Sequence, residues 1–164
     1  MRRSIRKVAV LGSGVMGSAI ACHFANIGCQ VLLLDMVPRE LTEEEKSKGL
    51  TFESKAVRNR IVQTSFDRSI KSNPAPLYSK KFVSRVVLGN FTDDMAKIKD
   101  FDWTIEVVVE NLEIKKRVYD EVEKYRRQGT LITSNTSGIP IHLMAEGRSE
   151  DFKKHFSGTH FFNP

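Results

Sequence analysis

Three glycines near the amino end of the chain have a spacing that suits the binding of phosphate groups. Gly12, Gly14 and Gly17 follow an apolar run at 7–11 and lead into a stretch with helical periodicity. In a strand–turn–helix unit, the first glycine permits a tight turn, the second lets the backbone approach a pyrophosphate, and the third lets the helix pack closely on the strand. Free N–H groups and the helix dipole then favour an anion. The residues predicted to bind a dinucleotide here are Gly12, Ser13, Gly14, Val15, Met16 and Gly17. The alternative is a glycine turn that binds nothing.

An acid follows the next apolar run and suits the ribose of the same ligand. Asp35 comes directly after the run at 30–34, where its carboxylate would accept hydrogen bonds from the adenosine ribose. A carboxylate would repel a 2′-phosphate, so NAD is expected as the cofactor rather than NADP. Arg39 keeps NADP open as an alternative, because a nearby arginine can accommodate that phosphate.

Polar residues also follow the later apolar runs. Glu110 and Asn111 follow the run at 103–109, residues 134–137 follow the run at 130–133, and His160 lies in the last strand candidate, 155–162. In open parallel sheets, ligands bind outside the carboxyl ends of the strands, so these groups are expected to face the cofactor. An imidazole suits proton transfer because its ordinary pKa lies near neutrality. Equally, residues 134–137 are ordinary turn formers, and Ser137 could simply cap a helix beginning at Pro140.

The order of apolar runs predicts one domain over residues 1–164 with an α/β fold. Strands are expected at 6–11, 30–34, 86–88, 103–109, 130–133 and within 155–162, and helices at 15–27, 53–72, 93–99, 113–127 and 140–146. Between 37 and 85 the pattern is least regular and includes an acidic loop before the helix at 53–72. Strands that alternate with helices, without hairpin signals, predict a Rossmann-type doubly wound, mostly parallel sheet with helices on both faces.

Composition narrows the class of protein. The chain has 164 residues, of which 40% are hydrophobic and 28% charged, as in ordinary globular domains. No apolar run approaches the ~20 residues of a membrane span, and the basic residues before the first strand leave no room for a signal peptide. Cys22 and Cys29 lack a metal-site spacing and indicate reduced thiols and a cytoplasmic location. The net charge of +6 comes from bases mixed with acids, which favours an anionic small molecule over nucleic acid.

Several motifs together resemble the amino-terminal domain of the L-3-hydroxyacyl-CoA dehydrogenases. They are the glycine motif, Glu106-Val107-Val108-Val109-Glu110-Asn111-Leu112-Glu113-Ile114-Lys115-Lys116, Ser134-Asn135-Thr136-Ser137 and Gly158-Thr159-His160-Phe161-Phe162-Asn163-Pro164. The resemblance covers nearly the whole chain in the same order, and the last two motifs are the most specific. Residues 73–78 depart from the shorter members and are similar to long bacterial proteins in which the dehydrogenase is fused to an enoyl-CoA hydratase region.

The resemblance implies a reaction and a set of roles. In β-oxidation of fatty acids, a 3-hydroxyacyl-CoA is oxidised to the 3-ketoacyl-CoA while hydride passes to NAD. By the resemblance, His160 is the catalytic base, Ser137 holds the substrate oxygen, and Asn163 contacts both cofactor and reacting region. Glu110 and Lys115 match positions on the nicotinamide-ribose side. The remaining histidines, His23, His142 and His155, are expected to be structural or exposed.

Two further expectations follow from the resemblance. The glutamate that orients the family's histidine and the helical domain that covers the acyl chain both correspond to positions after Pro164. The chain is therefore expected to be the cofactor half of a longer enzyme and to bind NAD with little turnover by itself. Its sequence does not determine the oligomeric state. The alternatives are a non-catalytic NAD-binding or structural module and a dehydrogenase of free 3-hydroxy acids.

One basic segment has two interpretations. The helix expected at 53–72 carries Lys55, Arg58, Arg60, Arg68 and Lys71. These bases form either a solvated face or a clamp for the phosphates of coenzyme A, since cations beside a substrate channel raise the local concentration of anions.

Overall fold

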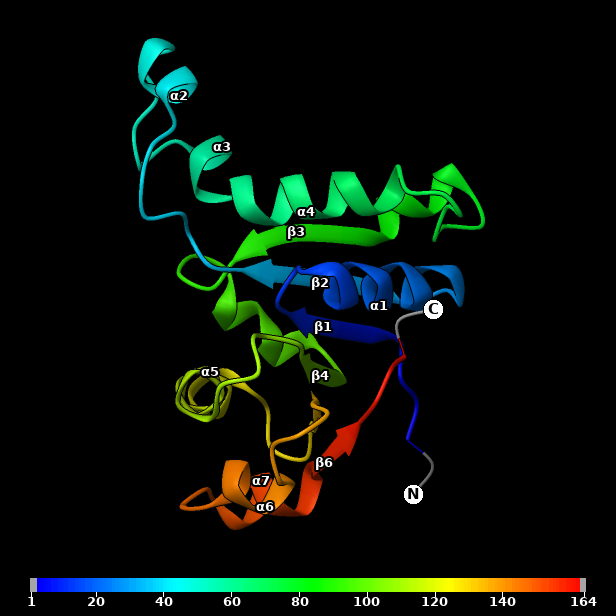
Figure 1. The fold of residues 1–164 in the computed structure, drawn as a ribbon. Coiled ribbons are helices and arrows are strands. Elements are labelled where there is room, and N and C mark those ends of the chain that lie inside the picture. The colour runs from blue at the N-terminus through cyan, green and yellow to red at the C-terminus, as the bar shows by residue number, and fades with distance from the viewer. Residues whose placement is uncertain (1–2, 163–164) are drawn as a thin grey trace.

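A computed structural model describes residues 3–162, which form one parallel sheet flanked by helices (Figure 1). The strands are β1 (Lys7–Leu11), β2 (Gln30–Asp35), β3 (Val86–Asn90), β4 (Trp103–Glu106), β5 (Leu131–Asn135) and β6 (Phe156–Thr159). Their order is β3-β2-β1-β4-β5-β6, and every neighbouring pair is parallel. This is the strand order of the doubly wound dinucleotide-binding sheet, so the predicted Rossmann-type fold is confirmed.

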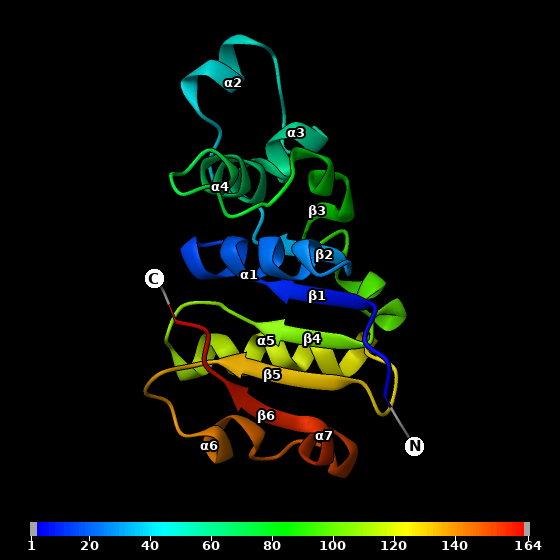
Figure 2. The same ribbon diagram turned by 90° about the vertical axis from the view of Figure 1, so that its right-hand side faces the viewer.

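Helices cover both faces of this sheet (Figure 2). The helices are α1 (Val15–Asn26), α2 (Glu43–Ser47), α3 (Lys55–Arg58), α4 (Arg60–Ile70), α5 (Leu112–Tyr125), α6 (Ile141–Ala145) and α7 (Glu150–His155), with 3₁₀ turns η1 (Lys80–Arg85) and η2 (Met95–Asp100). On one face, α1 and α4 contribute to one buried cluster; on the other, η2, α5, α6 and α7 contribute to a second. Among residues 3–162, none of the helices has both the length and the apolar character that a bilayer crossing demands.

The central strand β1 shows why the apolar runs are continuous. Val8 and Val10 point into the cluster with α1 and α4, while Ala9 and Leu11 point into the cluster with α5. All four are fully buried. A strand buried on both faces has no polar side, so its sequence does not alternate.

Backbone contacts explain two glycines of the motif. Gly12 has a φ of 109°, and a Cβ added there would lie 2.6 Å from the carbonyl oxygen of Val107. A Cβ on Gly17 would lie 1.8 Å from the carbonyl oxygen of Gly12, because α1 passes directly over the turn. Gly14 is different, since a Cβ there would have no neighbour within 4 Å.

The segment between β2 and β3 corrects two predictions. The helix expected at 53–72 is interrupted at Asn59, whose side-chain oxygen accepts a hydrogen bond of 2.7 Å from Asn90 Nδ2 and whose backbone leaves the helical region. The expected acidic loop contains helix α2, which begins with a capping box between Thr42 and Glu45. In Figure 1, α2 stands away from the sheet. Arg60 of α4 contacts this segment by donating hydrogen bonds to the Glu45 carboxylate and to the Glu40 carbonyl.

Other boundaries also differ from the predictions. The strand expected at 103–109 ends at Glu106, because the N–H of Val108 turns back to bond the Glu106 carboxylate at 2.7 Å. The helix expected at 93–99 is the 3₁₀ turn η2, and α7, capped by Ser149, was not predicted. Ser137 does not cap α6, because Pro140 occupies that position and no side chain caps the helix.

Alanine substitutions at Gly14 and Gly17 should have different effects on stability. Replacing Gly17 with alanine should lower the free energy of unfolding by about 1–3 kcal/mol, because backbone must move to admit the methyl group. Gly14→Ala should leave stability nearly unchanged, since its methyl group would enter open space. Urea unfolding followed by circular dichroism measures both; equal stability of the two variants would contradict the close approach of α1 to the turn.

Candidate functional site

The loops that could bind a ligand lie at one edge of the sheet. The chain crosses to one side after β1 and to the other after β4, and these two strands are neighbours at the centre of the sheet. In such sheets the ligand lies in the crevice outside this switch in strand order. The segments that follow β1, β2, β4, β5 and β6 therefore define the candidate site.

The glycine turn presents free backbone at the start of α1. Helix α1 begins after Gly14 with no side-chain cap and no acid in its first turn. Gly14 and Val15 are exposed, and the space beside Gly14 is open. An uncapped helix start with room beside it fits the pyrophosphate of a dinucleotide.

The structure joins Asp35 to this turn. Both the N–H and the hydroxyl of Ser13 donate to Asp35 Oδ2, at 2.6 and 2.5 Å, and the N–H of Met36 donates to Oδ1 at 2.7 Å. Ser13 is fully buried, whereas Asp35 is half-buried at the tip of β2. Ser13 thus fixes the carboxylate that would receive a ribose hydroxyl, and the residues present fit the cofactor's adenosine half.

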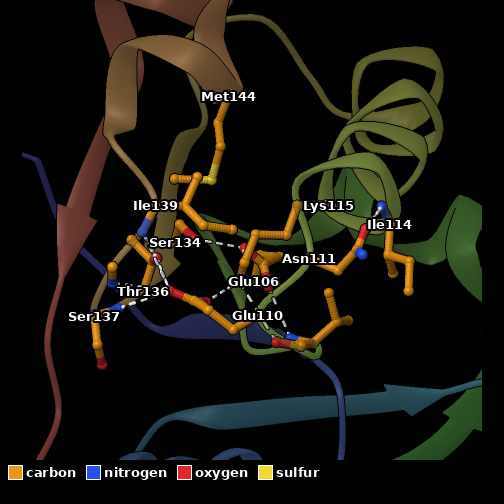
Figure 3. A network of polar contacts seen from close by, with 12 residues as sticks. Glu106, Glu110, Asn111, Ile114, Lys115, Ser134, Thr136, Ser137, Ile139 and Met144 are labelled. Carbon is orange, nitrogen blue, oxygen red and sulfur yellow. Dashed lines mark hydrogen bonds and ion pairs between the residues drawn. The ribbon is translucent and has the colours of Figure 1, made fainter.

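A buried charge cluster lies beneath the loops after β4 and β5 (Figure 3). The carboxylate of Glu106 accepts hydrogen bonds from Lys115 Nζ at 2.8 and 3.0 Å, from the Tyr119 hydroxyl at 2.7 Å and from the Ser134 hydroxyl at 2.5 Å. All four side chains are fully buried. The predicted cofactor residue Lys115 therefore lies inside the domain and has no exposed surface of its own.

Glu110 connects that cluster to the loop after β5. One of its oxygens, Oε2, lies 3.3 Å from Lys115 Nζ. The other, Oε1, accepts hydrogen bonds from the Thr136 hydroxyl and from three successive backbone N–H groups, those of Ser137, Gly138 and Ile139, at 3.1, 2.9 and 3.3 Å. Figure 3 shows Glu110 between Lys115 and this loop.

These contacts determine the charge of Glu110. Partial burial acts to raise its pKa, but the hydrogen bonds from Thr136, Gly138 and Ser137 and the nearby Lys115 charge outweigh it and lower the pKa to about 2. Glu110 is therefore an anion at neutral pH that accepts four hydrogen bonds from residues 136–139.

His160 is held over the same loop. Its Nδ1 lies 3.1 Å from the carbonyl oxygen of Thr136, and the N–H of Phe161 donates to Asn135 Oδ1 at 2.8 Å. A carbonyl only accepts, so this bond requires the proton on Nδ1 and leaves Nε2 of a neutral ring as the proton acceptor. The ring is exposed and its centroid lies 4.8 Å from that of Phe162.

Ser137 and His160 line one cavity of about 390 Å³, whose other walls include Ile139, Pro140 and Ile141. Both polar side chains are exposed at its rim. The structure thus brings together a hydroxyl and an imidazole from segments far apart in the sequence. Asn163, the third residue of this predicted set, lies outside the described residues.

The sequence did not predict that Glu106 and Tyr119 belong to the buried cluster beneath the candidate site. An acid within the otherwise apolar and β-branched run Trp103–Val109 was the available signal, since a buried carboxylate needs a charged partner. Lys115, on the helix that follows, supplies it.

The basic residues at 53–72 divide by their contacts. Arg58 pairs with Asp93 and Arg60 with Glu45, so both are used within the domain. Arg68 lines a cavity of about 590 Å³ between α1 and α4 that reaches Gly14. Lys55 and Lys71 are exposed.

Comparison with known proteins agrees with this geometry. The model of the family "3-hydroxyacyl-CoA dehydrogenase, NAD binding domain" matches residues 7–164. The chain belongs to this family. Its cofactor is NAD, in agreement with the carboxylate at Asp35.

Relatives of this dehydrogenase domain are longer proteins. A Bacillus subtilis protein named as a probable 3-hydroxyacyl-CoA dehydrogenase is 57% identical over all 164 residues, which make up 21% of that protein. A Rickettsia felis protein, assigned as a fatty acid oxidation complex trifunctional enzyme, is 37% identical, with the same coverage. The crystal structure of (S)-3-hydroxybutyryl-CoA dehydrogenase from Ralstonia eutropha matches 98% of this chain and 50% of that chain, with a TM-score of 0.65 and 28% identity. The chain thus spans about a fifth of the Bacillus subtilis and Rickettsia felis proteins.

Asp35 gives a direct test of the cofactor site. Asp35→Ala should weaken NADH binding by about 1–3 kcal/mol, the scale of a lost charged hydrogen-bond acceptor. Isothermal titration calorimetry measures the affinity, with the exposed acid Glu43 changed to alanine as the control. Unchanged affinity in Asp35→Ala would remove this carboxylate from the site.

Glu110 predicts a pH dependence of stability. Its folded pKa of about 2 lies below its ordinary value of 4.5, so its stabilising contribution is present above pH 4.5 and is lost as the pH falls toward 2. Glu110→Gln should therefore be less stable than the parent chain at pH 6, and the difference should shrink on acidification. Urea unfolding across this range measures the effect, and Glu113→Gln, which changes an exposed acid in the first turn of α5, is the control. A constant gap between the Glu110 variant and the parent would contradict the assignment.

Proposed function

We propose that the longer protein carrying this chain oxidises 3-hydroxyacyl-CoA to 3-ketoacyl-CoA, with residues 1–164 as its NAD-binding domain. The observation that carries the proposal is the meeting of Ser137 and His160 at one cavity, with His160 Nδ1 directed to the Thr136 carbonyl. Bound NAD would supply the acceptor for the hydride that leaves C3 of the substrate.

In this proposal, residues of the chain take the proton, bind the substrate oxygen and position these groups. His160 Nε2 takes the proton of the substrate hydroxyl, because Nδ1 is already engaged as a donor. The Ser137 hydroxyl bonds the substrate oxygen and holds C3 toward the cofactor. The family resemblance assigns Asn163 to contacts with the cofactor and the reacting region. Glu110 lies on the nicotinamide-ribose side, and Lys115, being buried, acts there by holding Glu110.

The names of the relatives support the proposed substrate and context. A 3-hydroxyacyl-CoA dehydrogenase and a fatty acid oxidation trifunctional enzyme are both named for acyl-chain oxidation, and the second name implies fusion to other activities. We therefore propose an acyl-CoA substrate and a chain fused to an enoyl-CoA hydratase region. The two buried free cysteines, Cys22 and Cys29, support a reducing, cytoplasmic location.

Replacing His160 tests this function in the full-length protein. His160→Gln should lower kcat with acetoacetyl-CoA and NADH by about 10²–10⁴-fold, the range for loss of a general acid–base group, and should keep the NADH affinity within about twofold. The exposed His142→Gln is the matched control and should behave like the parent enzyme.

The same experiment separates the second candidate, a non-catalytic NAD-binding module. Such a module would bind NADH and show no turnover in the parent protein. Full turnover by His160→Gln would instead place the proton transfer elsewhere and overturn the mechanism proposed for His160.

A further inference from the structure

Glu106 is saturated by protein donors and has no capacity left for a ligand. Besides Lys115, Tyr119 and Ser134, the N–H of Val108 bonds Glu106 Oε1 at 2.7 Å. Removing a carboxylate and an ammonium from water costs several kcal/mol each, and well-packed apolar side chains would serve stability as well or better. The pair at Glu106 and Lys115 therefore calls for an explanation other than stability.

The contacts of Lys115 suggest such an explanation, because this residue contacts one carboxylate in the core and another at the surface. Its Nζ bonds both oxygens of Glu106 inside the core and lies 3.3 Å from Oε2 of Glu110 and 3.4 Å from the Val108 carbonyl. The ammonium thus joins a buried carboxylate, which accepts hydrogen bonds from α5, β5 and the turn after β4, to a carboxylate that lies at the surface.

Tyr119 keeps the inner carboxylate in place. Burial raises the pKa of its phenol, and the neighbouring Glu106 charge raises it further, so the hydroxyl remains a donor to Glu106 at every pH of interest. Phe152 and Phe156 pack edge-on against the ring, at centroid distances of 5.5 and 5.2 Å, and restrict its movement.

From Glu110 the contacts continue to the reacting groups. Its Oε1 gathers the Thr136 hydroxyl and the N–H groups of residues 137–139, which sets the position of Ser137. The carbonyl of the same Thr136 receives His160 Nδ1. A continuous path of hydrogen bonds and ion pairs therefore runs from the fully buried Glu106 to the imidazole.

We propose that Glu106, Lys115 and Tyr119 are positioning residues for the dehydrogenase reaction, which act through Glu110 to orient Ser137 and His160. The proposal rests on the proposed function. A shift of the loop by about 1 Å would move the hydroxyl and the imidazole out of reach of the substrate, and misplacement on that scale can cost about 100-fold in rate.

The principal test is Glu106→Gln in the full-length protein. We expect kcat with acetoacetyl-CoA and NADH to fall about 10- to 100-fold. The affinity for ADP, which lacks the nicotinamide-side ribose and contacts only the glycine turn and Asp35 in this proposal, should stay within about twofold of the parent. In ¹⁵N spectra, His160 should lose the strong preference for the Nδ1-protonated tautomer.

A matched control comes from the same strand. Thr104 is fully buried, and its hydroxyl has no hydrogen-bond partner among the described residues. Thr104→Val therefore changes a buried polar group of β4 that lies off the path, and it should leave kcat, ADP affinity and the His160 spectrum unchanged.

Tyr119→Phe keeps the inference testable where Glu106→Gln does not fold. This variant removes one donor to Glu106 and retains the ring, so we expect a fall in kcat of about fivefold, the scale of one hydrogen bond. Combined with Thr136→Val at the far end of the path, it should show a non-additive effect on kcat, since both act on one network.

Three results would overturn the inference. The first is parent-like kcat in a folded Glu106→Gln or Tyr119→Phe variant. The second is a parallel fall of kcat and ADP affinity, which would indicate general damage to the sheet. The third is strict additivity in the Tyr119 and Thr136 cycle. If His160→Gln abolishes turnover while the buried variants do not affect it, only this inference fails; if His160→Gln retains turnover, the proposed function fails.

Discussion

The buried carboxylate of Glu106 is the group around which the carboxyl edge of the sheet is organised. It lies at the last position of β4, where the chain leaves the sheet beside β1, and its donors come from α5, from β5 and from the turn that follows it. A buried carboxylate needs a hydrogen-bond donor for each acceptor site, because an acceptor without a donor loses its hydration with nothing to compensate the desolvation free energy. That requirement fixes three segments relative to one another, including the two loops that carry Glu110 and Ser137.

The two halves of the site are built by different physical means. At the glycine turn the main constraint is steric, because backbone meets backbone at Gly12 and Gly17, and Ser13 adds hydrogen bonds to Asp35. At the opposite half the constraint is electrostatic and passes through side chains, from Glu106 to Glu110 and the loop at 136–139. The glycine turn would hold the cofactor, which many enzymes share, whereas the polar network would position the groups that we propose for the dehydrogenase reaction.

This division explains how one scaffold accommodates relatives that share only part of its sequence. The Ralstonia eutropha structure superposes at a TM-score of 0.65 with 28% identity, so the overall fold is similar although most side chains differ. Continuous apolar strands such as β1 need only volume and hydrophobicity on both faces, which many residue combinations supply. The polar groups at the strand ends are less replaceable, since each has a specific partner at hydrogen-bond distance.

The sequence alone determined the doubly wound fold, the glycine turn, Asp35, and the positions of Ser137 and His160 at strand ends, because apolar periodicity and local motifs encode these features. It could not show that Asn59 interrupts a helix, since that depends on Asn90 thirty-one residues away. Nor could it show that Lys115 is buried or that the Thr136 carbonyl takes His160 Nδ1. Those features depend on contacts between segments distant in the chain, and only the packing of α5, β4, β5 and β6 brings their atoms together.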